Sequence, residues 1–441
     1  MSKPVTAIIV GAGHRAMMYA SLALSNPEKL QIVGVADPDD AHREMAVKQF
    51  NIPPNMIFKD AEELAKHPRL ADAIINGTMD QQHVPTSIPL LALGYDMLLE
   101  KPFCVNEGEM WELYAAAEKY GNKVMICHVL RYSPFYVEIK KRLAAGEIGD
   151  IINIQLTEHV AYHHLMVSFV RGKWRSEEVC FAPMLLAKCC HDMDLMMWLM
   201  GADDPAAVSS FGSIFSFAPE KRPAGAGSKC LVDCPKEVEE ACPYSARKHY
   251  IDHPDRWFFY VWDKFIGKEP PATIDEKIAE LQGDSNYGRC AWDCGHTNVD
   301  HQSVMVNFKS GATGTLNMIG GAAKGERNIH IIGTKGEIKG TFDDSLYEVR
   351  TIHQAPGEVP YKTEVVDMKI GGDKTGLTGS HGGGDMLMVE DFVDICRGEE
   401  PSISSTSLTD SVKGHLAVFC AEEARKNNTV VSMTNRFSPK E

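Results

Sequence analysis

The chain has 441 residues, 44% hydrophobic and 24% charged, which is an ordinary globular balance and enough length for two domains. Its formal net charge of −15 argues against nucleic acid or an anionic membrane as the main partner. Because no stretch is long and apolar enough for a signal-peptide core or a membrane span, the sequence predicts a soluble cytoplasmic protein.

A glycine-rich motif follows the first predicted strand, Ala7–Val10, and opens a helical pattern. In a G-x-G-x-x-A motif the first glycine permits a tight turn, and the second lets a pyrophosphate approach the backbone. The small alanine allows close packing of the helix. We therefore expect a bound dinucleotide at this motif. The residues concerned are Gly11, Gly13, His14, Arg15 and Ala16.

A second predicted strand, Leu30–Ala36, ends at Asp37, which lies 24 residues after Gly13. In dinucleotide-binding folds an acid near this position binds the ribose hydroxyls of the adenosine. Its negative charge also repels a 2′-phosphate, so Asp37 favours NAD over NADP as the cofactor. A solvated Asp-Pro turn is the alternative interpretation of the same residue.

The strand-and-helix pattern continues as far as residue 128. Strands are predicted at Ala73–Asn76, Met97–Leu99 and Lys123–Cys127, and Asn106 with Glu109 has the spacing of a helix cap. This alternation predicts a parallel, doubly wound sheet, which binds its ligands beyond the carboxyl ends of the strands. The residues at or beside those ends are Gly11, Asp37, Thr78, His83, Glu100, Lys101 and His128, and all but His128 are predicted cofactor contacts.

Three segments together resemble the glucose–fructose oxidoreductase, inositol dehydrogenase and rhizopine-catabolism (Gfo/Idh/MocA) family. They are the glycine motif, Glu100-Lys101-Pro102 and Cys190-His191-Asp192-Met193-Asp194-Leu195. The resemblance covers almost the whole chain. It implies an N-terminal Rossmann domain and a C-terminal α/β domain with an open, mostly antiparallel sheet that commonly forms the subunit interface. The chemistry that it implies is hydride transfer between NAD(P) and a hydroxyl of a sugar or cyclitol.

The resemblance also implies roles for individual residues. Lys101 matches the lysine that lies next to the nicotinamide and the substrate hydroxyl, and His191 matches the catalytic histidine. Asp194 matches an acid that frequently binds substrate. Arg131 matches a position that often lines the sugar pocket. We therefore expect Lys101 and His191 to be catalytic and the other two residues to contact the substrate.

One position departs from the family pattern. The family usually has an aspartate four residues before the catalytic histidine, and this chain has Ala187 there. The usual relay of lysine, aspartate and histidine therefore cannot operate unchanged. The neighbouring Lys188 either supplies a replacement charge in the substrate site or faces solvent, and the sequence leaves both interpretations open.

From residue 151 onward the hydrophobic period changes. Apolar residues alternate with polar ones at 152–156, 304–308 and 329–331, as on half-buried strands. Sequential hairpins predict an antiparallel sheet, in agreement with the resemblance. Residues Met184–Met200 are apolar nearly all round and predict one buried helix that carries His191.

These patterns divide the chain into two predicted domains, a Rossmann domain at 1–128 and a domain for substrate binding and oligomerisation at 129–441. Residues 212–295 are predicted to be an insertion in the second domain. The C-terminal helices at 385–426 are expected to pack back on the Rossmann domain. The C-terminal sheet is expected to join copies of the chain into a homo-oligomer.

A ring-rich segment around His164 and Trp174 suits a sugar pocket, because aromatic rings stack on apolar sugar faces and polar groups bind hydroxyls. We expect His164 to contact the substrate. His381 precedes three glycines that open a helix, and it is a further candidate for substrate binding. Metal binding by the neighbouring histidines is less favoured, since their spacing matches no compact metal motif.

Five of the twelve cysteines group within the insertion. They are Cys230, Cys234, Cys242, Cys290 and Cys294. Such a group could hold a structural metal, but the spacings are not those of standard zinc knuckles. Reduced thiols in a loop-rich segment are the favoured interpretation, so no metal site is predicted.

The sequence thus predicts an NAD-dependent oxidoreductase that moves a hydride between the nicotinamide and a ring hydroxyl of a sugar or glycoside. Lys101 and His191 would accept and relay the hydroxyl proton. Oxidation at C3 of a glucoside-type ring is the favoured position. One alternative is a redox-neutral glycosidase that retains NAD and acts through a 3-keto intermediate. The other alternative is a non-catalytic regulator that senses the nucleotide.

Overall fold

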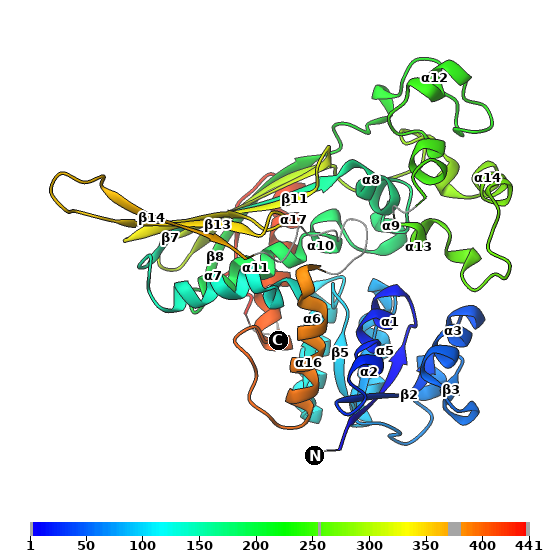
Figure 1. The fold of residues 1–441 in the computed structure, drawn as a ribbon, viewed down its shortest axis with the longest axis horizontal. Helices are drawn as coiled ribbons and strands as arrows, with labels where there is room; N and C mark the ends of the chain where they lie inside the picture. Colours follow the sequence, from blue (N-terminus) through cyan, green and yellow to red (C-terminus); the bar gives the residue numbers. More distant parts are fainter. Residues whose placement is uncertain (1–2, 255–256, 369–380, 438–441) are drawn as a thin grey trace.

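The computed structural model describes residues 3–254, 257–368 and 381–437 and contains two β-sheets. Figure 1 shows the N-terminal part of the chain, in blue and cyan, beneath a broad sheet, with the green helices of the insertion beyond the end of that sheet. A parallel Rossmann-type sheet is thus combined with an open, mostly antiparallel one, which confirms the predicted fold class. Within the described ranges, no helix has the length and hydrophobicity needed to cross a membrane.

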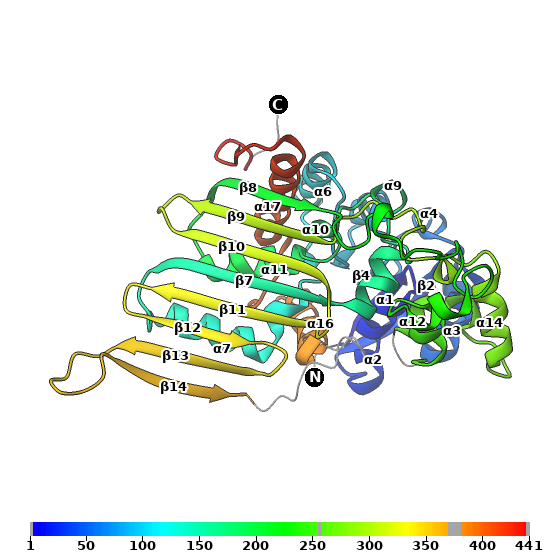
Figure 2. The same ribbon diagram turned by 90° about the horizontal axis from the view of Figure 1, so that it is seen from above.

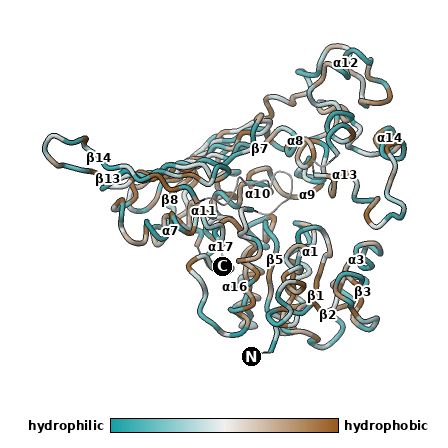
Figure 3. The backbone as a smooth tube through the Cα atoms, in the orientation of Figure 1, coloured by the Kyte–Doolittle hydropathy of each residue, from teal (hydrophilic) through white to brown (hydrophobic). Residues whose placement is uncertain are grey.

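The first sheet has six parallel strands in the order β3-β2-β1-β4-β5-β6. Their bounds are β1 Val5–Val10, β2 Leu30–Ala36, β3 Ile57–Phe58, β4 Ala73–Asn76, β5 Asp96–Leu99 and β6 Val124–Ile126. The strands are apolar (Figure 3), because helices cover a parallel sheet on both faces. The predicted strands at Leu30–Ala36 and Ala73–Asn76 coincide with β2 and β4 and are confirmed.

Helices pack on both faces of this sheet. Their bounds are α1 His14–Ala20, α2 Leu22–Ser25, α3 Asp40–Phe50, α4 Ala61–Leu64, α5 His83–Ala92 and α6 Glu107–Tyr120. Asn106 caps α6 as predicted, since its side chain accepts a hydrogen bond from the Glu109 amide at 2.9 Å. The C-terminal helix α16 (Gly384–Cys396) joins α1 on one face, where its Met388 and Phe392 share a core cluster with β1.

The second sheet has nine strands in the order β14-β13-β12-β11-β7-β10-β9-β8-β15. Their bounds are β7 Ile151–Ala161, β8 Pro205–Ser213, β9 His301–Phe308, β10 Thr313–Ala322, β11 Glu326–Gly333, β12 Gly336–Thr341, β13 Leu346–Ile352, β14 Tyr361–Asp367 and β15 Val431–Ser432. Most neighbours are antiparallel as predicted, but β7 and β10 pair in parallel. The parallel pair arises because β7 lies between β10 and β11, which run in opposite directions, so β7 is parallel to one of them.

Among the described residues, helices cover only one face of the second sheet. They are α7 Pro134–Ala144, α11 Cys190–Met200 and α17 Leu408–Asn427. Figure 2 shows strands β7 to β14 laid side by side, with the other, open face of the sheet toward the viewer. That open face carries apolar side chains, among them Phe211, Met305 and Ile319, which are 68%, 54% and 45% exposed.

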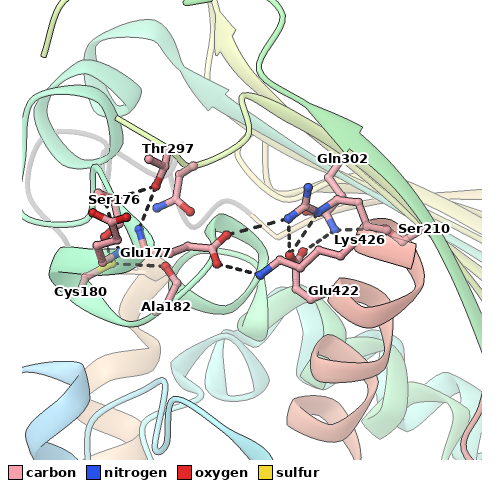
Figure 4. Close-up of polar contacts among 12 residues, drawn as sticks. Ser176, Glu177, Cys180, Ala182, Ser210, Thr297, Gln302, Glu422 and Lys426 are labelled. Carbon is pink, nitrogen blue, oxygen red and sulfur yellow. Dashed lines mark hydrogen bonds and ion pairs between the residues drawn. The ribbon is translucent and has the colours of Figure 1, made fainter. Parts of the chain in front are cut away.

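Polar contacts join α17 to the sheet and to the short helix α9 (Glu177–Cys180), as Figure 4 shows. The buried Glu422 accepts a hydrogen bond from Gln302 Nε2 at 2.7 Å, and Lys426 Nζ lies 2.8 Å from a Glu177 carboxylate oxygen. These contacts hold α9 in place directly before the segment that carries the predicted catalytic histidine.

The segment Met184–Met200, predicted as one helix, is broken in two. Helix α10 (Met184–Ala187) ends at Ala187, and α11 begins at Cys190. The single-helix prediction was wrong because apolar periodicity does not report that Lys188 forms an ion pair with Glu158 of β7 at 3.0 Å. The carbonyl groups of Met184 and Leu185 still accept the amides of Lys188 and Cys189, each at 3.0 Å, but the Ala187 carbonyl at the end of α10 is open to a side chain.

The predicted insertion, residues 212–295, is rich in loops, and its described residues form only short helices. They are α12 Lys236–Ala241, α13 Phe258–Val261 and α14 Ile274–Gln282, and α8 (Tyr162–Leu165) lies beside them. The insertion shares a small hydrophobic core with the segment after α8. The buried members of that core are Val167, Ala246, Tyr250, Val261, Trp262 and Leu281.

Candidate active site

The glycine motif packs tightly on one side and leaves space on the other. Gly11 has a φ of +77°, and a Cβ there would lie 2.6 Å from the Thr78 amide nitrogen, so only glycine fits. A Cβ added at Gly77 would lie 2.7 Å from the Cβ of Ala16. This close packing explains why both positions hold small residues. A Cβ at Gly13 would meet no described atom within 4 Å. The backbone at Gly13 is therefore open to a ligand.

Asp37 lies directly behind this motif. Its carboxylate accepts hydrogen bonds from the Ala12 amide at 2.6 Å and from the Asp39 amide at 2.8 Å. Burial raises the pKa of Asp37, but hydrogen bonds from His42 and these amides outweigh it and leave the pKa lowered. Asp37 is therefore ionised at neutral pH. A contact with the ribose of a cofactor stays a prediction.

A network of charged side chains holds the strand end that precedes Lys101. Arg15 Nε lies 3.1 Å from a Glu100 oxygen, and the guanidinium also pairs with Asp385 at the start of α16. Tyr19 donates a 2.7 Å hydrogen bond to Glu100. The other Asp385 oxygen lies 3.2 Å from His381 Nδ1. Arg15 and Glu100 border the pocket, but their charged groups point at each other.

Lys101 Nζ donates a 2.9 Å hydrogen bond to the carbonyl oxygen of Ala187. Ala187 is the residue that stands where the family usually has an aspartate. Its carbonyl lies at the C-terminal end of α10, where the helix dipole favours a cation. A main-chain oxygen thus occupies the position next to the lysine. The loop after Lys101 is held by His83, whose ring nitrogens lie 2.7 Å from the Pro102 carbonyl and 3.0 Å from the Thr78 carbonyl.

His191 is buried close to Lys101, and its ring centroid lies 5.7 Å from that of His128 and 5.8 Å from that of His381. Burial, together with the positive charge of Lys101, holds the pKa of His191 well below its usual range. The imidazole is therefore neutral at physiological pH. A neutral imidazole can accept a hydrogen bond or a proton from a substrate hydroxyl.

Lys188 does not face solvent. It pairs with Glu158 of β7 at 3.0 Å, and the second Glu158 oxygen lies 2.7 Å from Arg327 Nε. Arg327 in turn lies 3.0 Å from Asp192 in α11. Two cations and two carboxylates thus form a buried cluster at the edge of the pocket, and its basic members line the pocket wall. The sequence left open whether Lys188 supplies a charge in the site or faces solvent, and its position fits the first interpretation.

Arg131 and Asp194 pair with each other. Two guanidinium nitrogens of Arg131 lie 2.7 and 2.5 Å from the two carboxylate oxygens of Asp194, and both side chains are almost completely buried. Neither residue is among the described residues that line the pocket. The expected contact with substrate is therefore absent from this arrangement. The pair instead fixes α11 against the 3₁₀ turn Val129–Tyr132 that follows β6.

Most of the remaining predicted residues converge on one pocket between the Rossmann sheet and the second domain, with about 1180 Å³ of space including its open mouth. Those that line it are Gly13, His14, Arg15, Thr78, His83, Glu100, Lys101, His164, Lys188, His191 and His381. Gly11, Ala16 and Asp37 lie behind the motif and do not line it among the residues described.

Other residues of the pocket are not among the site residues predicted from the sequence. Asp80 is buried and accepts a 2.9 Å hydrogen bond from Trp174 Nε1. Arg327 comes from β11, where its strand shows ordinary alternation and gives no local signal. Phe259 of the insertion stacks on His14 with ring centroids 4.0 Å apart, and Trp257 stacks on His164 at 4.2 Å. The insertion therefore forms a wall of the pocket directly over the glycine motif.

The match to family models spans most of the chain. One model, described as an oxidoreductase family with an NAD-binding Rossmann fold, matches residues 5–128. A second, described as an oxidoreductase family C-terminal alpha/beta domain, matches residues 140–242 and 258–430.

Individual relatives agree with these matches. YteT of Bacillus subtilis (strain 168), assigned as an oxidoreductase, is 24% identical over 377 residues, which is 82% of each chain. The scyllo-inositol 2-dehydrogenase (NAD(+)) of the same organism is 26% identical over 222 residues, covering 49% of this chain and 59% of that one. The structure of the WlbA dehydrogenase from Bordetella pertussis, in complex with NADH and UDP-GlcNAcA, has a TM-score of 0.67 at 14% identity, covering 100% and 99% of the two chains. At this identity the likeness shows the fold.

Proposed function

This chain belongs to the Gfo/Idh/MocA oxidoreductase family, and we propose that it is an NAD-dependent dehydrogenase of a sugar or glycoside. One observation carries the proposal. Lys101 and His191, from different domains, border the same pocket as the open backbone at Gly13. The relative named scyllo-inositol 2-dehydrogenase (NAD(+)) supports a ring hydroxyl as the group oxidised.

The residues around the glycine motif fit a dinucleotide. The space beside Gly13 admits a pyrophosphate to the backbone, and the tight contacts of Gly11 and Ala16 hold the loop in place. The bound nicotinamide supplies the hydride acceptor. Asp37 is ionised behind the motif, and its negative charge would repel a 2′-phosphate. We therefore propose NAD rather than NADP as the cofactor.

Side chains of the protein must remove the proton of the substrate hydroxyl. Lys101 is held by the Ala187 carbonyl and points into the pocket, where it can act as general base. Neutral His191 can donate its ring N–H to the oxygen of the same hydroxyl and fix its orientation. His164, Lys188 and His381 border the rest of the pocket and are proposed to bind the other hydroxyl groups.

The test is a screen of free sugars, cyclitols and glycosides that reads cofactor absorbance and product identity together. We expect formation of NADH with at least one ring-hydroxyl substrate, a clear preference for NAD over NADP, and a 3-keto product if C3 is the position oxidised. Cleavage of a glycoside without net NADH would instead establish the redox-neutral glycosidase. The absence of both turnover and substrate-dependent NADH fluorescence across the screen would refute the dehydrogenase proposal.

We propose that the open face of the second sheet joins two copies of the chain. Its apolar side chains Phe211, Met305 and Ile319 are exposed on one surface, and such surfaces mark association sites. We expect a dimer or larger oligomer by light scattering at micromolar concentration. The double change Phe211→Asp with Met305→Asp should shift the protein toward monomer. The same pair of changes at exposed Leu24 and Val430 is the control, and an unchanged mass in the first variant would contradict the proposal.

A further inference from the structure

One cation of the active-site pocket has no anionic partner. Lys173 is exposed and lines the pocket, and its Nζ forms no ion pair or hydrogen bond among the described residues. Every other lysine or arginine that lines the pocket in the described part of the chain already contacts a carboxylate or a carbonyl oxygen. Those residues are Arg15, Lys101, Lys188 and Arg327. Lys173 is therefore available to bind an anion that enters the pocket.

Aromatic rings hold the ammonium group of Lys173 in place. Its Nζ lies 4.6 Å from the ring centroid of Trp174 and 5.3 Å from that of Tyr260, distances at which the face of a ring attracts a cation. Trp174 is itself fixed, because its Nε1 donates a 2.9 Å hydrogen bond to Asp80 in the turn after β4. Lys173 of the second domain thus lies beside the end of a central Rossmann strand.

A series of ring contacts leads from Lys173 to the glycine motif. The Tyr260 ring, over which the ammonium group lies, has its centroid 4.7 Å from that of Phe259. Phe259 in turn stacks on His14 of the motif with centroids 4.0 Å apart. The insertion therefore holds Lys173 and the motif on the same side of the pocket.

The motif offers no available side-chain charge to a pyrophosphate. Arg15 pairs with Glu100 and with Asp385. Burial, together with the positive charges of Arg15 and Lys173, lowers the pKa of His14 to about 4, so its ring is neutral at physiological pH. A pyrophosphate linkage carries a negative charge on each phosphate, and charges in a pocket are costly unless an opposite charge faces them. A free cation has to come from outside the motif.

We propose that Lys173 binds the pyrophosphate of the dinucleotide and so completes the cofactor site from the second domain. The inference rests on the proposed NAD-dependent function. An ion pair between ammonium and phosphate is stronger inside a pocket than on the surface, because less water screens it. The glycine spacing could not indicate this residue, since Lys173 follows β7 and lies outside the Rossmann strands. Its role is to bind the cofactor, with no part in the proton transfer.

A carboxylate or phosphate group of the substrate has the same chemistry and is the competing partner. The position of Lys173 favours the cofactor. Besides burial, the lysine and the arginine that lower the pKa of His191 are Lys101 and Arg327. Lys173 instead acts on His14, to which the ring contacts also connect it. The free cation thus lies toward the cofactor end of the pocket and not beside the predicted catalytic histidine.

The test measures binding without turnover, by calorimetric titration of the full-length protein with NADH and with ADP-ribose, which keeps the pyrophosphate but lacks nicotinamide. Lys173→Met should weaken the binding of both by about tenfold or more, the loss expected for a hydrogen bond between charged groups. The difference should shrink at high salt, since salt screens the ion pair in the unaltered chain. Lys173→Gln should show the same loss, so the result does not depend on how one variant folds.

Two controls make the loss specific. Lys173→Arg keeps the charge and should retain most of the affinity. Lys119 Nζ also lies over a ring, 5.0 Å from the centroid of Tyr120, but Lys119 is not among the described residues that line the pocket. Lys119→Met should therefore leave both affinities unchanged.

Unchanged affinity for ADP-ribose in both neutral variants of Lys173 would overturn the proposal and leave the NAD-dependent function standing. A raised KM for an acidic sugar, with cofactor affinity unchanged, would overturn it in favour of a substrate contact. An unaltered chain that binds neither NADH nor ADP-ribose would refute the cofactor, and with it both this contact and the proposed dehydrogenase.

Discussion

Replacing Lys101 by methionine is expected to lower turnover by roughly 10²- to 10⁴-fold, which is the range that a positioned acid or base contributes. The physical reason is its location. Its Nζ borders the pocket, held 2.9 Å from the Ala187 carbonyl. Methionine keeps the length and volume of the side chain but cannot accept the substrate proton. We expect cofactor affinity, measured by NADH fluorescence, to change far less than turnover, because the glycine motif remains intact.

Two further variants make this result specific. Lys101→Arg keeps a positive charge but cannot give up its proton near neutral pH, so it should not restore turnover. Lys66→Met removes an exposed lysine on the Rossmann domain and should leave turnover unchanged. Turnover within about threefold of normal in Lys101→Met would contradict a catalytic role. It would instead favour the interpretation that the chain senses a nucleotide without catalysis.

Five of the six strands of the Rossmann sheet could be predicted because their signal is local, whereas the two-residue strand β3 was not predicted. A buried parallel strand is apolar along its whole length, so β2 and β4 appear in the sequence with their observed bounds. The parallel pairing of β7 with β10 could not be predicted in this way. It depends on where an early strand inserts among later ones, and the alternation of side chains is the same in parallel and antiparallel positions of a half-covered sheet.

The residues of the candidate site likewise fall into those that local sequence signals predict and those that only long-range contacts bring together. Lys101 and the glycine motif follow strands whose carboxyl ends share one edge of the sheet, so topology alone places them together. Arg327 joins the site through Glu158 and Asp192, which are far from it in the sequence. No short motif reports such contacts. The break between α10 and α11 was hidden for the same reason, since it follows from the long-range partners of Lys188 and Ala187.

The second large effect is expected at the buried pair Arg131 and Asp194. Asp194→Asn should lower the free energy of unfolding by about 3–5 kcal/mol, the cost of leaving one member of a buried ion pair without its partner. Arg131 is 2% exposed and Asp194 is 1% exposed. Two guanidinium nitrogens of Arg131 each contact one of the two carboxylate oxygens of Asp194. Chemical denaturation followed by tryptophan fluorescence measures the change.

A double variant separates this structural role from the substrate-binding role that the family resemblance implies. Arg131→Met with Asp194→Leu removes both charges and fills the space with apolar atoms, so it should be more stable than Asp194→Asn alone. Glu62→Gln, in an exposed pair with Lys66, should have no measurable effect on stability. If Asp194→Asn unfolds like the unaltered protein and instead raises KM for the sugar, the carboxylate binds substrate. The pairing with Arg131 would then have to open, and α11 to move, when the proposed substrate binds.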